Sequence, residues 1–256
     1  MRIAIVGYGK MGKLIRTEAL SCGHEVVAVI DPWSPAPEIT ALNLDAATLG
    51  GCDVAIDFTH PATIVDDIVL YARLGIPAVI GTTGWYDRLD EVKDTVEGLD
   101  CSIIYSGNYS MGVAVFLQIV KKAALLFDRV GGYDSFIQEI HHAQKADSPS
   151  GTASMLAQIL LDNSSSKQSI VAETLHRKRE DDEIQVGSIR SGYYPGTHTV
   201  CFDSPDDTIE LTHRARSREG FAVGAVKAAQ WIADGRKGFF TLSDMLDDVF
   251  KNMEDE

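Results

Sequence analysis

The feature that most constrains the fold is a glycine-rich turn placed directly after the first strand of the chain. Residues 2–7 are apolar and predict a short strand, and Gly7, Gly9 and Gly12 follow it at the spacing G-x-G-x-x-G. A helix and a second apolar strand come next, and this second strand ends at Asp31. The order predicts a βαβ unit whose turn lets the backbone approach a pyrophosphate at a helix N-terminus. A glycine turn that binds no nucleotide is the weaker alternative in this context.

Strands and helices continue to alternate up to about residue 112. Strands are predicted at 54–59, 78–83 and 101–106, with helices at 62–74 and 86–98. This alternation indicates a Rossmann-type, doubly wound parallel sheet, which binds its ligands at the carboxyl ends of the strands. Those ends and the first turn supply the candidate cofactor-binding residues, which are Gly7, Tyr8, Gly9, Lys10, Met11, Gly12, Asp31, Gly81, Thr82, Thr83, Ser106, Gly107, Asn108 and Tyr109.

The pattern changes after Gly112. The expected elements are helices at 113–127 and 151–162 and strands near 135–142, 184–190, 197–203 and 207–215. Strands that succeed one another without helices favour a mostly antiparallel sheet. After Arg218 the helical pattern returns, and we expect this segment to pack back on the first domain. The predicted fold class is therefore α/β, with a dinucleotide-binding domain (1–112 and 218–256) and a smaller α+β domain (113–217).

Residues 139–153 concentrate more reactive side chains than any other stretch. His141 and His142 lie at the end of the expected strand, Lys145 follows in a loop, and Ser150 can cap a helix that begins near Gly151. Imidazole and ammonium groups can donate protons, and free N–H groups at a helix start attract an anion. The stretch therefore predicts a site for a small acidic substrate. The plainer alternative is a strand, loop and helix with half-buried histidines.

The charge and the cysteines exclude several classes of partner. The formal net charge of −14 would repel nucleic acid and anionic membranes, so neither is an expected partner. The four cysteines lie far apart and form no C-x-x-C pair, so we expect reduced thiols, no disulfide and no metal site. No signal peptide or apolar run of membrane-spanning length is recognised, which favours a cytoplasmic protein.

The block Glu139–Ala153 resembles the motif E-x-H-H-x-x-K-x-D-x-P-S-G-T-A of the dihydrodipicolinate reductase family, also called 4-hydroxy-tetrahydrodipicolinate reductases. The resemblance extends to residues 81–84, 108–112, 190–198 and 221–225. It implies an NAD(P)H-dependent oxidoreductase of lysine and diaminopimelate biosynthesis. Such an enzyme reduces 4-hydroxy-tetrahydrodipicolinate, a small dicarboxylate, to tetrahydrodipicolinate with loss of water. The resemblance also implies a homotetramer built on the sheet of the second domain.

The resemblance suggests a role for each residue of the block. His141 and Lys145 would be the catalytic residues, with His141 as the general acid, although the residues alone leave the choice of proton donor open. One substrate carboxylate would bind at the helix start, and Thr83 would lie between nicotinamide and substrate. The implied substrate-binding residues are His142, Ser150, Gly151, Thr152 and Thr83.

The end of the second strand bears on the choice of cofactor. An acidic side chain such as Asp31 can accept hydrogen bonds from the ribose hydroxyls of NADH, and its charge disfavours the 2′-phosphate of NADPH. We therefore expect both cofactors to be used, with NADH preferred. The alternative is that Asp31 only caps the turn that follows it. Two other functions are kept as alternatives, a diaminopimelate or aspartate dehydrogenase and an NAD(H)-sensing module without turnover.

Overall fold

A computed structural model describes the backbone of residues 1–254 and the side chains of residues 1–249. The chain divides into two compact units, one of Met1–Met111 with Glu219–Glu256 and one of Gly112–Arg218. These limits lie one residue from the predicted domain ends. The return of the chain after residue 218 to the first unit agrees with the helical pattern seen there.

The first unit contains a six-stranded sheet in the order β11-β5-β4-β3-β1-β2, and all of its pairs are parallel. The predicted doubly wound parallel sheet is confirmed. Its central strands β1, β3 and β4 are buried along almost their whole length, as expected for strands covered on both faces. The strands are β1 (Arg2–Val6), β2 (Glu25–Ile30), β3 (Val54–Asp57), β4 (Ala78–Ile80), β5 (Ser102–Tyr105) and β11 (Gly238–Thr241).

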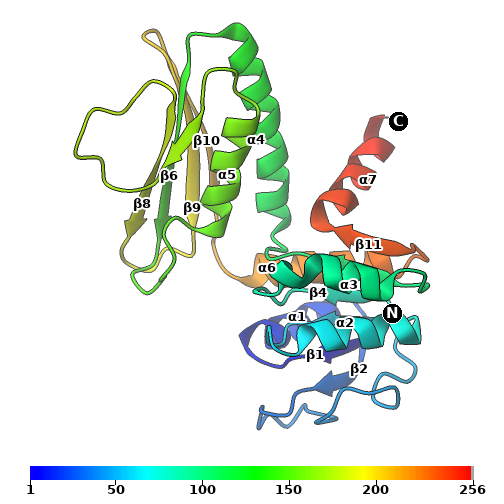
Figure 1. Cartoon of the computed structure of the whole chain (residues 1–256). Helices are drawn as coiled ribbons and strands as arrows, with labels where there is room; N and C mark the ends of the chain where they lie inside the picture. The colour runs from blue at the N-terminus through cyan, green and yellow to red at the C-terminus, as the bar shows by residue number, and fades with distance from the viewer. Residues whose placement is uncertain (255–256) are drawn as a thin grey trace. The chain divides into compact units, whose positions relative to one another are not determined.

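The helices of this unit are α1 (Lys10–Ser21), α2 (Ile64–Leu74), α3 (Leu89–Val96), α6 (Glu219–Ile232) and α7 (Leu242–Glu254), with a short 3-10 turn η1 (Tyr86–Arg88). Figure 1 shows α2 and α3 side by side, and α6 packs against α1 and the central strands. β11 and α7 were not expected from the sequence. β11 is only four residues long and is defined by its pairing with β5, a partner far away in the chain.

The second unit contains a five-stranded sheet in the order β10-β9-β6-β8-β7. The prediction of a mostly antiparallel sheet holds for β10, β9 and β6 and is wrong for β8 and β7, which pair in parallel. The reason is α5, which returns the chain from the end of β6 to the end of the sheet where β6 begins. The next strands, β7 and β8, therefore run in the same direction as β6. The strands are β6 (Asp134–His141), β7 (Ser169–Val171), β8 (Glu183–Arg190), β9 (Thr197–Asp203) and β10 (Thr208–Arg214).

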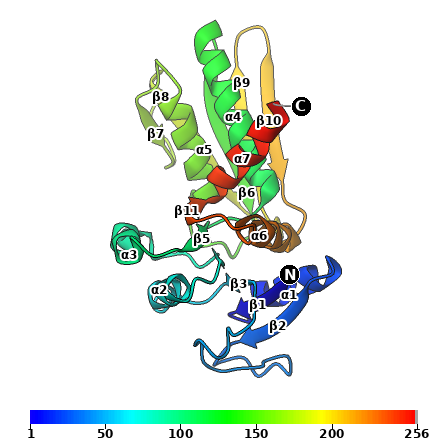
Figure 2. The same ribbon diagram turned by 90° about the vertical axis from the view of Figure 1, so that its right-hand side faces the viewer.

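Two helices, α4 (Met111–Val130) and α5 (Gly151–Asp162), lie on one face of this sheet (Figures 1 and 2). Their apolar sides close the core of the unit: Phe116 and Val120 of α4 and Leu156 of α5 pack with Ile137 of β6 and Phe202 of β9. Because side chains alternate along a strand, β6 sends residues 137, 139 and 141 to the helix-covered face. That alternation decides which polar residues of β6 become buried.

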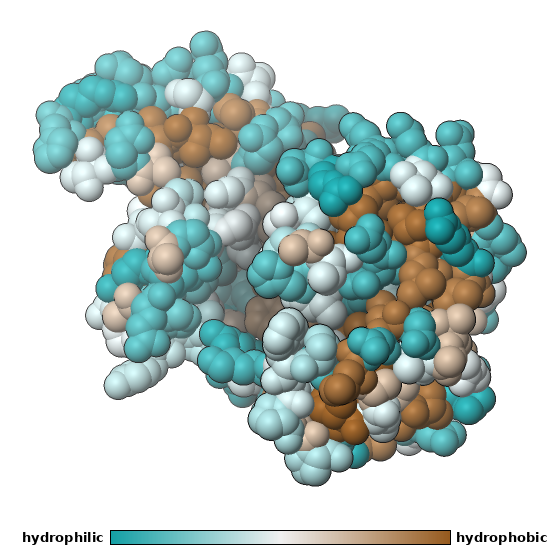
Figure 3. All heavy atoms as spheres, turned by 60° about the horizontal axis from the view of Figure 1, so that its bottom comes forward, coloured by the Kyte–Doolittle hydropathy of each residue, from teal (hydrophilic) through white to brown (hydrophobic). Residues whose placement is uncertain are grey.

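Hydrophilic side chains and apolar patches alternate over the face of the molecule shown in Figure 3. In the second unit, α4 exposes a stripe of apolar side chains that includes Ile119, Leu126 and Val130. Among the described residues, no helix is both long enough and apolar enough to cross a membrane.

Asp57, at the carboxyl end of β3, is fully buried and predicts a pH-dependent stability. Its carboxylate accepts hydrogen bonds from the Tyr71 hydroxyl at 2.8 Å and from the Thr59 hydroxyl at 2.6 Å. Burial, and secondly the charge of Asp67, raise the pKa of Asp57 to about 7. The folded state therefore holds a proton that the unfolded chain has already lost, so stability from this group is complete below about pH 4 and is lost as the pH rises to about 7.

We expect the Asp57→Asn variant to lack this dependence. Between pH 5 and pH 7 the free energy of unfolding of the wild type should fall, relative to the variant, by about 2 kcal/mol. Urea unfolding of the cofactor-free protein at several pH values measures the difference. Parallel curves for the two proteins would contradict the assignment.

Candidate active site

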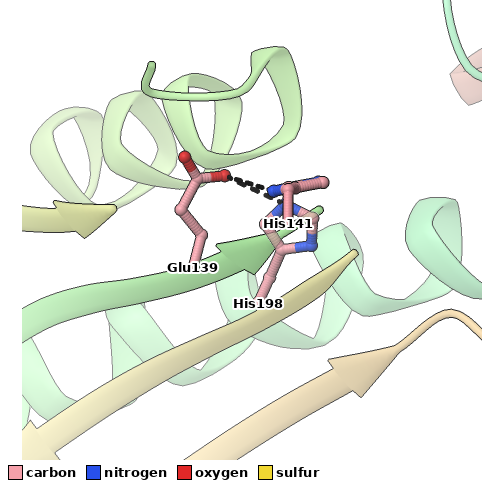
Figure 4. Close-up of side chains that lie close together, drawn as sticks. All are labelled: Glu139, His141 and His198. Carbon is pink, nitrogen blue, oxygen red and sulfur yellow. Dashed lines mark ion pairs between the residues drawn. The ribbon is translucent and has the colours of Figure 1, made fainter. Parts of the chain in front are cut away.

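The register of the second sheet brings one acidic and several basic side chains together. Glu139 of β6 lies opposite His198 of β9 on one side and opposite Ser188 of β8 on the other. Two residues further along β6, His141 lies opposite Arg190. Since residues i and i+2 of a strand share a face, Glu139 and His141 point to the same helix-covered side. Figure 4 shows Glu139, His141 and His198 converging from β6 and β9.

The Glu139 carboxylate is fully buried and is surrounded by donors. Its Oε1 accepts hydrogen bonds from the Ser150 backbone N–H at 2.9 Å, the Ser188 hydroxyl at 2.7 Å and the Arg190 guanidinium at 2.7 Å. Its Oε2 lies 3.2 Å from His141 Nδ1 and 3.6 Å from His198 Nε2. Burial alone would raise its pKa, but the hydrogen bonds from His198, Ser150, Arg190 and Ser188 outweigh burial and hold the pKa well below its ordinary value. Glu139 is therefore a buried carboxylate anion.

His141 is 7% exposed and is neutral at neutral pH in this arrangement. Burial is the largest cause that lowers its pKa, to about 4, and His198, Lys145 and Arg190 act in the same direction. Glu139 acts in the opposite direction but does not outweigh them. Gly196 packs closely against the other ring nitrogen, because a Cβ at that position would lie only 2.9 Å from His141 Nε2.

The loop after β6 carries His142 and Lys145. His142 is half-buried, and its backbone N–H donates to the Tyr194 carbonyl oxygen at 2.8 Å. Lys145 Nζ lies 2.8 Å from Asp147 Oδ1, and its side chain is 23% exposed. Arg190 ties the same loop to the sheet, since its guanidinium donates to the Asp147 carbonyl oxygen at 2.6 Å. The ammonium group of Lys145 is thus paired with Asp147, and its charge is one of those that lower the pKa of His141.

Ser150 caps α5, as the sequence predicts. Its hydroxyl accepts a hydrogen bond from the Ala153 N–H at 3.2 Å and lies 3.1 Å from His198 Nε2. Ser150 is 3% exposed, and its hydroxyl serves the helix cap and contacts the histidine; its contribution to substrate binding stays a prediction. Gly151 and Thr152 form the first turn of α5, in which Gly151 is exposed and Thr152 is half-buried.

The glycines of the first turn divide into two kinds. A Cβ on Gly7 would lie 2.2 Å from the Phe58 carbonyl oxygen, and a Cβ on Gly12 would lie 2.1 Å from the Gly7 carbonyl oxygen. These two glycines allow strand and helix to approach closely. A Cβ on Gly9 would meet nothing within 4 Å, and Gly9 is also the N-cap of α1. The middle glycine therefore borders open space at a helix start, as a pyrophosphate site requires.

The Asp31 carboxylate accepts hydrogen bonds from backbone N–H groups of its own unit. One carboxylate oxygen accepts the Tyr8 N–H at 2.7 Å, and the other accepts the N–H groups of Trp33 at 2.7 Å and Ser34 at 3.0 Å. The turn-capping alternative for Asp31 is thus present in the structure. Carboxylate oxygens accept more than one hydrogen bond, so the capping role does not exclude a contact with ribose.

The remaining cofactor candidates occupy the carboxyl ends of β4 and β5. Thr82 is buried, and its hydroxyl accepts the Thr59 N–H at 2.8 Å, whereas Thr83 and Gly107 are exposed. Tyr109 is 1% exposed, and its hydroxyl lies 3.0 Å from the carbonyl oxygens of Ile80 and Ile104. The phenol of Tyr109 is therefore part of the core, and only its backbone can serve a cofactor. Lys10, Met11, Gly81, Ser106 and Asn108 lie exposed or half-buried in the same unit.

The donor atoms of Glu139, His141 and His198 lie within 4.8 Å of one another and could hold a metal ion. Arg190 already balances the charge of this carboxylate at 2.7 Å and would repel a metal cation. The sequence-based expectation of no metal stays a prediction.

Comparisons with known proteins decide the family. Models of the N-terminal and C-terminal parts of dihydrodipicolinate reductase match residues 1–109 and 112–246. A 4-hydroxy-tetrahydrodipicolinate reductase of Christiangramia forsetii is 38% identical over 98% of this chain and 100% of its own length. One of Archaeoglobus fulgidus is 38% identical over 96% of this chain and 100% of its own.

The chain belongs to the dihydrodipicolinate reductase family.

This reductase is accordingly an NAD(P)H-dependent oxidoreductase of the lysine and diaminopimelate pathway. The solved structure of a dipicolinate-bound dihydrodipicolinate reductase from Paenisporosarcina sp. TG-14 superposes with a TM-score of 0.77 at 26% identity and covers 94% of this chain and 97% of its own. A diaminopimelate dehydrogenase of C. glutamicum gives a TM-score of 0.54 at 15% identity, which shows a shared fold alone. The dehydrogenase and sensor alternatives are not favoured.

The sequence patterns did not indicate roles for Glu139, Ser188, Arg190 and His198. Glu139 stands in an apolar strand at two residues from His141, and an acid at a core-facing position needs a partner. That signal could have pointed to Glu139. The partners on β8 and β9 could not be found in this way, because only the strand register brings them to Glu139.

Proposed function

We propose that the second unit of the reductase binds the dicarboxylate substrate between the first turn of α5 and the pair His141 and Lys145. The observation that carries this proposal is the buried Glu139 carboxylate, which accepts the Ser150 N–H at the start of α5 and lies beside the histidines of β6 and β9. One substrate carboxylate binds the N–H groups of Gly151 and Thr152, and His142 contributes to the same pocket. The dipicolinate bound to the Paenisporosarcina reductase is a planar dicarboxylate of this kind.

The first unit binds the nicotinamide cofactor, which supplies the hydride when bound. Gly9 and the start of α1 hold the pyrophosphate, and Thr83 lies just after the end of β4. The protein's own residues then neutralise the substrate and deliver a proton to the carbanion-like product. Because its pKa is lowered, His141 holds no transferable second proton at neutral pH, which disfavours the sequence-based choice of His141 as the general acid. We therefore assign the proton donation to Lys145 and a hydrogen-bonding role to His141.

A titration with dipicolinate tests the proposed binding mode. We expect pyridine-2,6-dicarboxylate to bind the NADH-loaded reductase at least tenfold more tightly than pyridine-2-carboxylate, because two carboxylates engage two cationic or N–H-rich groups. Isothermal titration calorimetry measures both affinities. Equal affinities for the two compounds would contradict a two-carboxylate site.

We also propose that NADH is preferred over NADPH. The charge of Asp31 lies at the end of β2, and the following residues 32–35 contain no cation. Because Asp31 is partly exposed, the effect should be modest, a several-fold to about tenfold ratio of kcat/KM in favour of NADH. The Asp31→Asn variant keeps one acceptor oxygen for the turn and should move this ratio toward one. A ratio that favours NADPH in the wild type would mean that a nearby cation such as Lys10 or Lys13 outweighs Asp31.

We further propose a cytoplasmic homotetramer assembled through the second unit. Ile119, Leu126 and Val130 form one exposed stripe on α4, and Ile189 of β8 is 54% exposed on the sheet face opposite the helices. Exposed apolar side chains, such as the α4 stripe and Ile189, favour burial between subunits. Light scattering at micromolar concentration should give a tetramer mass, and a monomer mass would contradict the assembly.

A further inference from the structure

Glu139 has two oxygens with different environments, and the difference has a chemical meaning. Oε1 receives three hydrogen bonds, from Ser150, Ser188 and Arg190. Oε2 receives no hydrogen bond of good geometry from any described residue, and the same is true of His141 Nδ1. These two atoms lie 3.2 Å apart, and both are buried. The nearest group that can satisfy each of them is therefore the other.

The protonation of His141 follows from this contact. A nitrogen lone pair that faced a carboxylate oxygen at this distance would be repelled, whereas an N–H would be attracted. The ring proton of neutral His141 therefore belongs on Nδ1. Nε2 is then the acceptor nitrogen, and it is the nitrogen that packs against Gly196.

We propose that Glu139 is a positioning residue that fixes His141 in the Nδ1–H form, with Nε2 as the acceptor nitrogen, and that it anchors the start of α5 through the Ser150 N–H. One carboxylate thus sets the distance between the imidazole and the anion-binding turn. This inference rests on the proposed function for its kinetic consequence, but the state of His141 can be measured without turnover.

The groups that face His141 determine what loss of the Glu139 charge would do. These are Glu139 on β6, His198 on β9, Arg190 on β8, and Lys145 with Asp147 in the following loop. Glu139 opposes the cations that lower the pKa of His141. The Glu139→Gln variant should therefore lower the pKa of His141 further and remove the preference for a proton on Nδ1.

Nitrogen NMR of protein labelled at the histidine ring nitrogens tests the inference directly. The His141 signals are assigned by comparison with a His141→Asn variant. In the wild type at pH 7 we expect a protonated Nδ1 and an unprotonated Nε2. A wild-type His141 that carries its proton on Nε2 would overturn the proposal by itself, whether or not any variant folds.

Kinetics separate positioning from a purely structural role. We expect Glu139→Gln to lower kcat at least tenfold while the dissociation constant of NADH stays within twofold. Glu139→Asp keeps the charge and should recover part of the lost kcat. Gln138→Ala changes the exposed neighbour of Glu139 on the opposite face of β6, and should stay within threefold of the wild type. Equal losses of kcat in the Gln and Asp variants, or none in either, would contradict the proposal.

The positioning of His141 by Glu139 and the reductase activity can be tested separately. If the wild type shows the expected His141 tautomer, and Glu139→Gln changes it, but neither protein reduces the substrate, the positioning inference holds and the proposed function is wrong. If turnover is normal and the tautomer is reversed, the positioning inference is wrong and the function stands.

Discussion

Replacing Lys145 with alanine should lower kcat at least a hundredfold at neutral pH while leaving NADH binding within twofold of the wild type. Lys145 is the accessible ammonium group of the candidate site, and the neighbouring imidazole of His141 is neutral because burial lowers its pKa to about 4. Loss of a positioned proton donor costs on the order of a hundred- to ten-thousandfold in rate. Steady-state kinetics and a fluorescence titration with NADH measure the two effects.

Two further variants define the role of Lys145. Lys145→Arg keeps the positive charge but not a readily transferred proton, so it should restore KM for the substrate more than kcat. Lys178→Ala removes an exposed lysine of the same unit and should leave both constants near the wild-type values. A near-normal kcat/KM in Lys145→Ala would exclude Lys145 as the proton donor.

Replacing Gly224 with alanine should destabilise the first unit severely. A Cβ at this position of α6 would lie 1.7 Å from the Tyr109 carbonyl oxygen, and a backbone atom held by a buried residue has little freedom to withdraw. Overpacking against side chains typically costs about 1–3 kcal/mol, and we expect at least about 3 kcal/mol here because the obstacle is backbone. Thermal and urea unfolding of the purified variant give the loss.

The matched control lies in the same helix. A Cβ on Gly220 would meet nothing within 4 Å, so Gly220→Ala should be neutral or stabilise the protein by up to about 1 kcal/mol through its helix propensity. Equal unfolding midpoints for the Gly224 and Gly220 variants would show that α6 can move away from Tyr109. Such a result would contradict the close packing of this helix.

Local patterns were sufficient to predict the first unit up to β5. Gly7, Gly9 and Gly12 lie at the spacing of a dinucleotide-binding turn, and a helix follows each of β3, β4 and β5. β11 was not predicted, because the segment Gly238–Thr241 is too short to show the alternation of a strand. Its pairing partner β5 is also far away in the sequence. The parallel pairing of β6 with β8 was not predicted, because the helix between them resembles an insertion in a run of strands. The order strand, helix, strand is nevertheless typical of a parallel crossover.

The candidate site was predicted only where the reactive residues are neighbours in sequence. His141, Lys145 and Ser150 lie within one short block, and residue type and spacing were enough to select them. Glu139 belongs to the same block, but its role could not be predicted because it depends on His198 and Ser188 across the sheet. The protonation of His141 could not be predicted either, since it depends on burial and on charges from three strands and a loop.

The oxidation of NADH in the presence of freshly made 4-hydroxy-tetrahydrodipicolinate tests the account most directly. We expect absorbance at 340 nm to fall in proportion to enzyme concentration with this substrate and to remain constant with pyruvate or diaminopimelate as controls. Dipicolinate should inhibit the reaction, because it occupies the proposed dicarboxylate site. Absence of turnover with 4-hydroxy-tetrahydrodipicolinate and either cofactor, in a folded protein that binds NADH, would contradict the central claim.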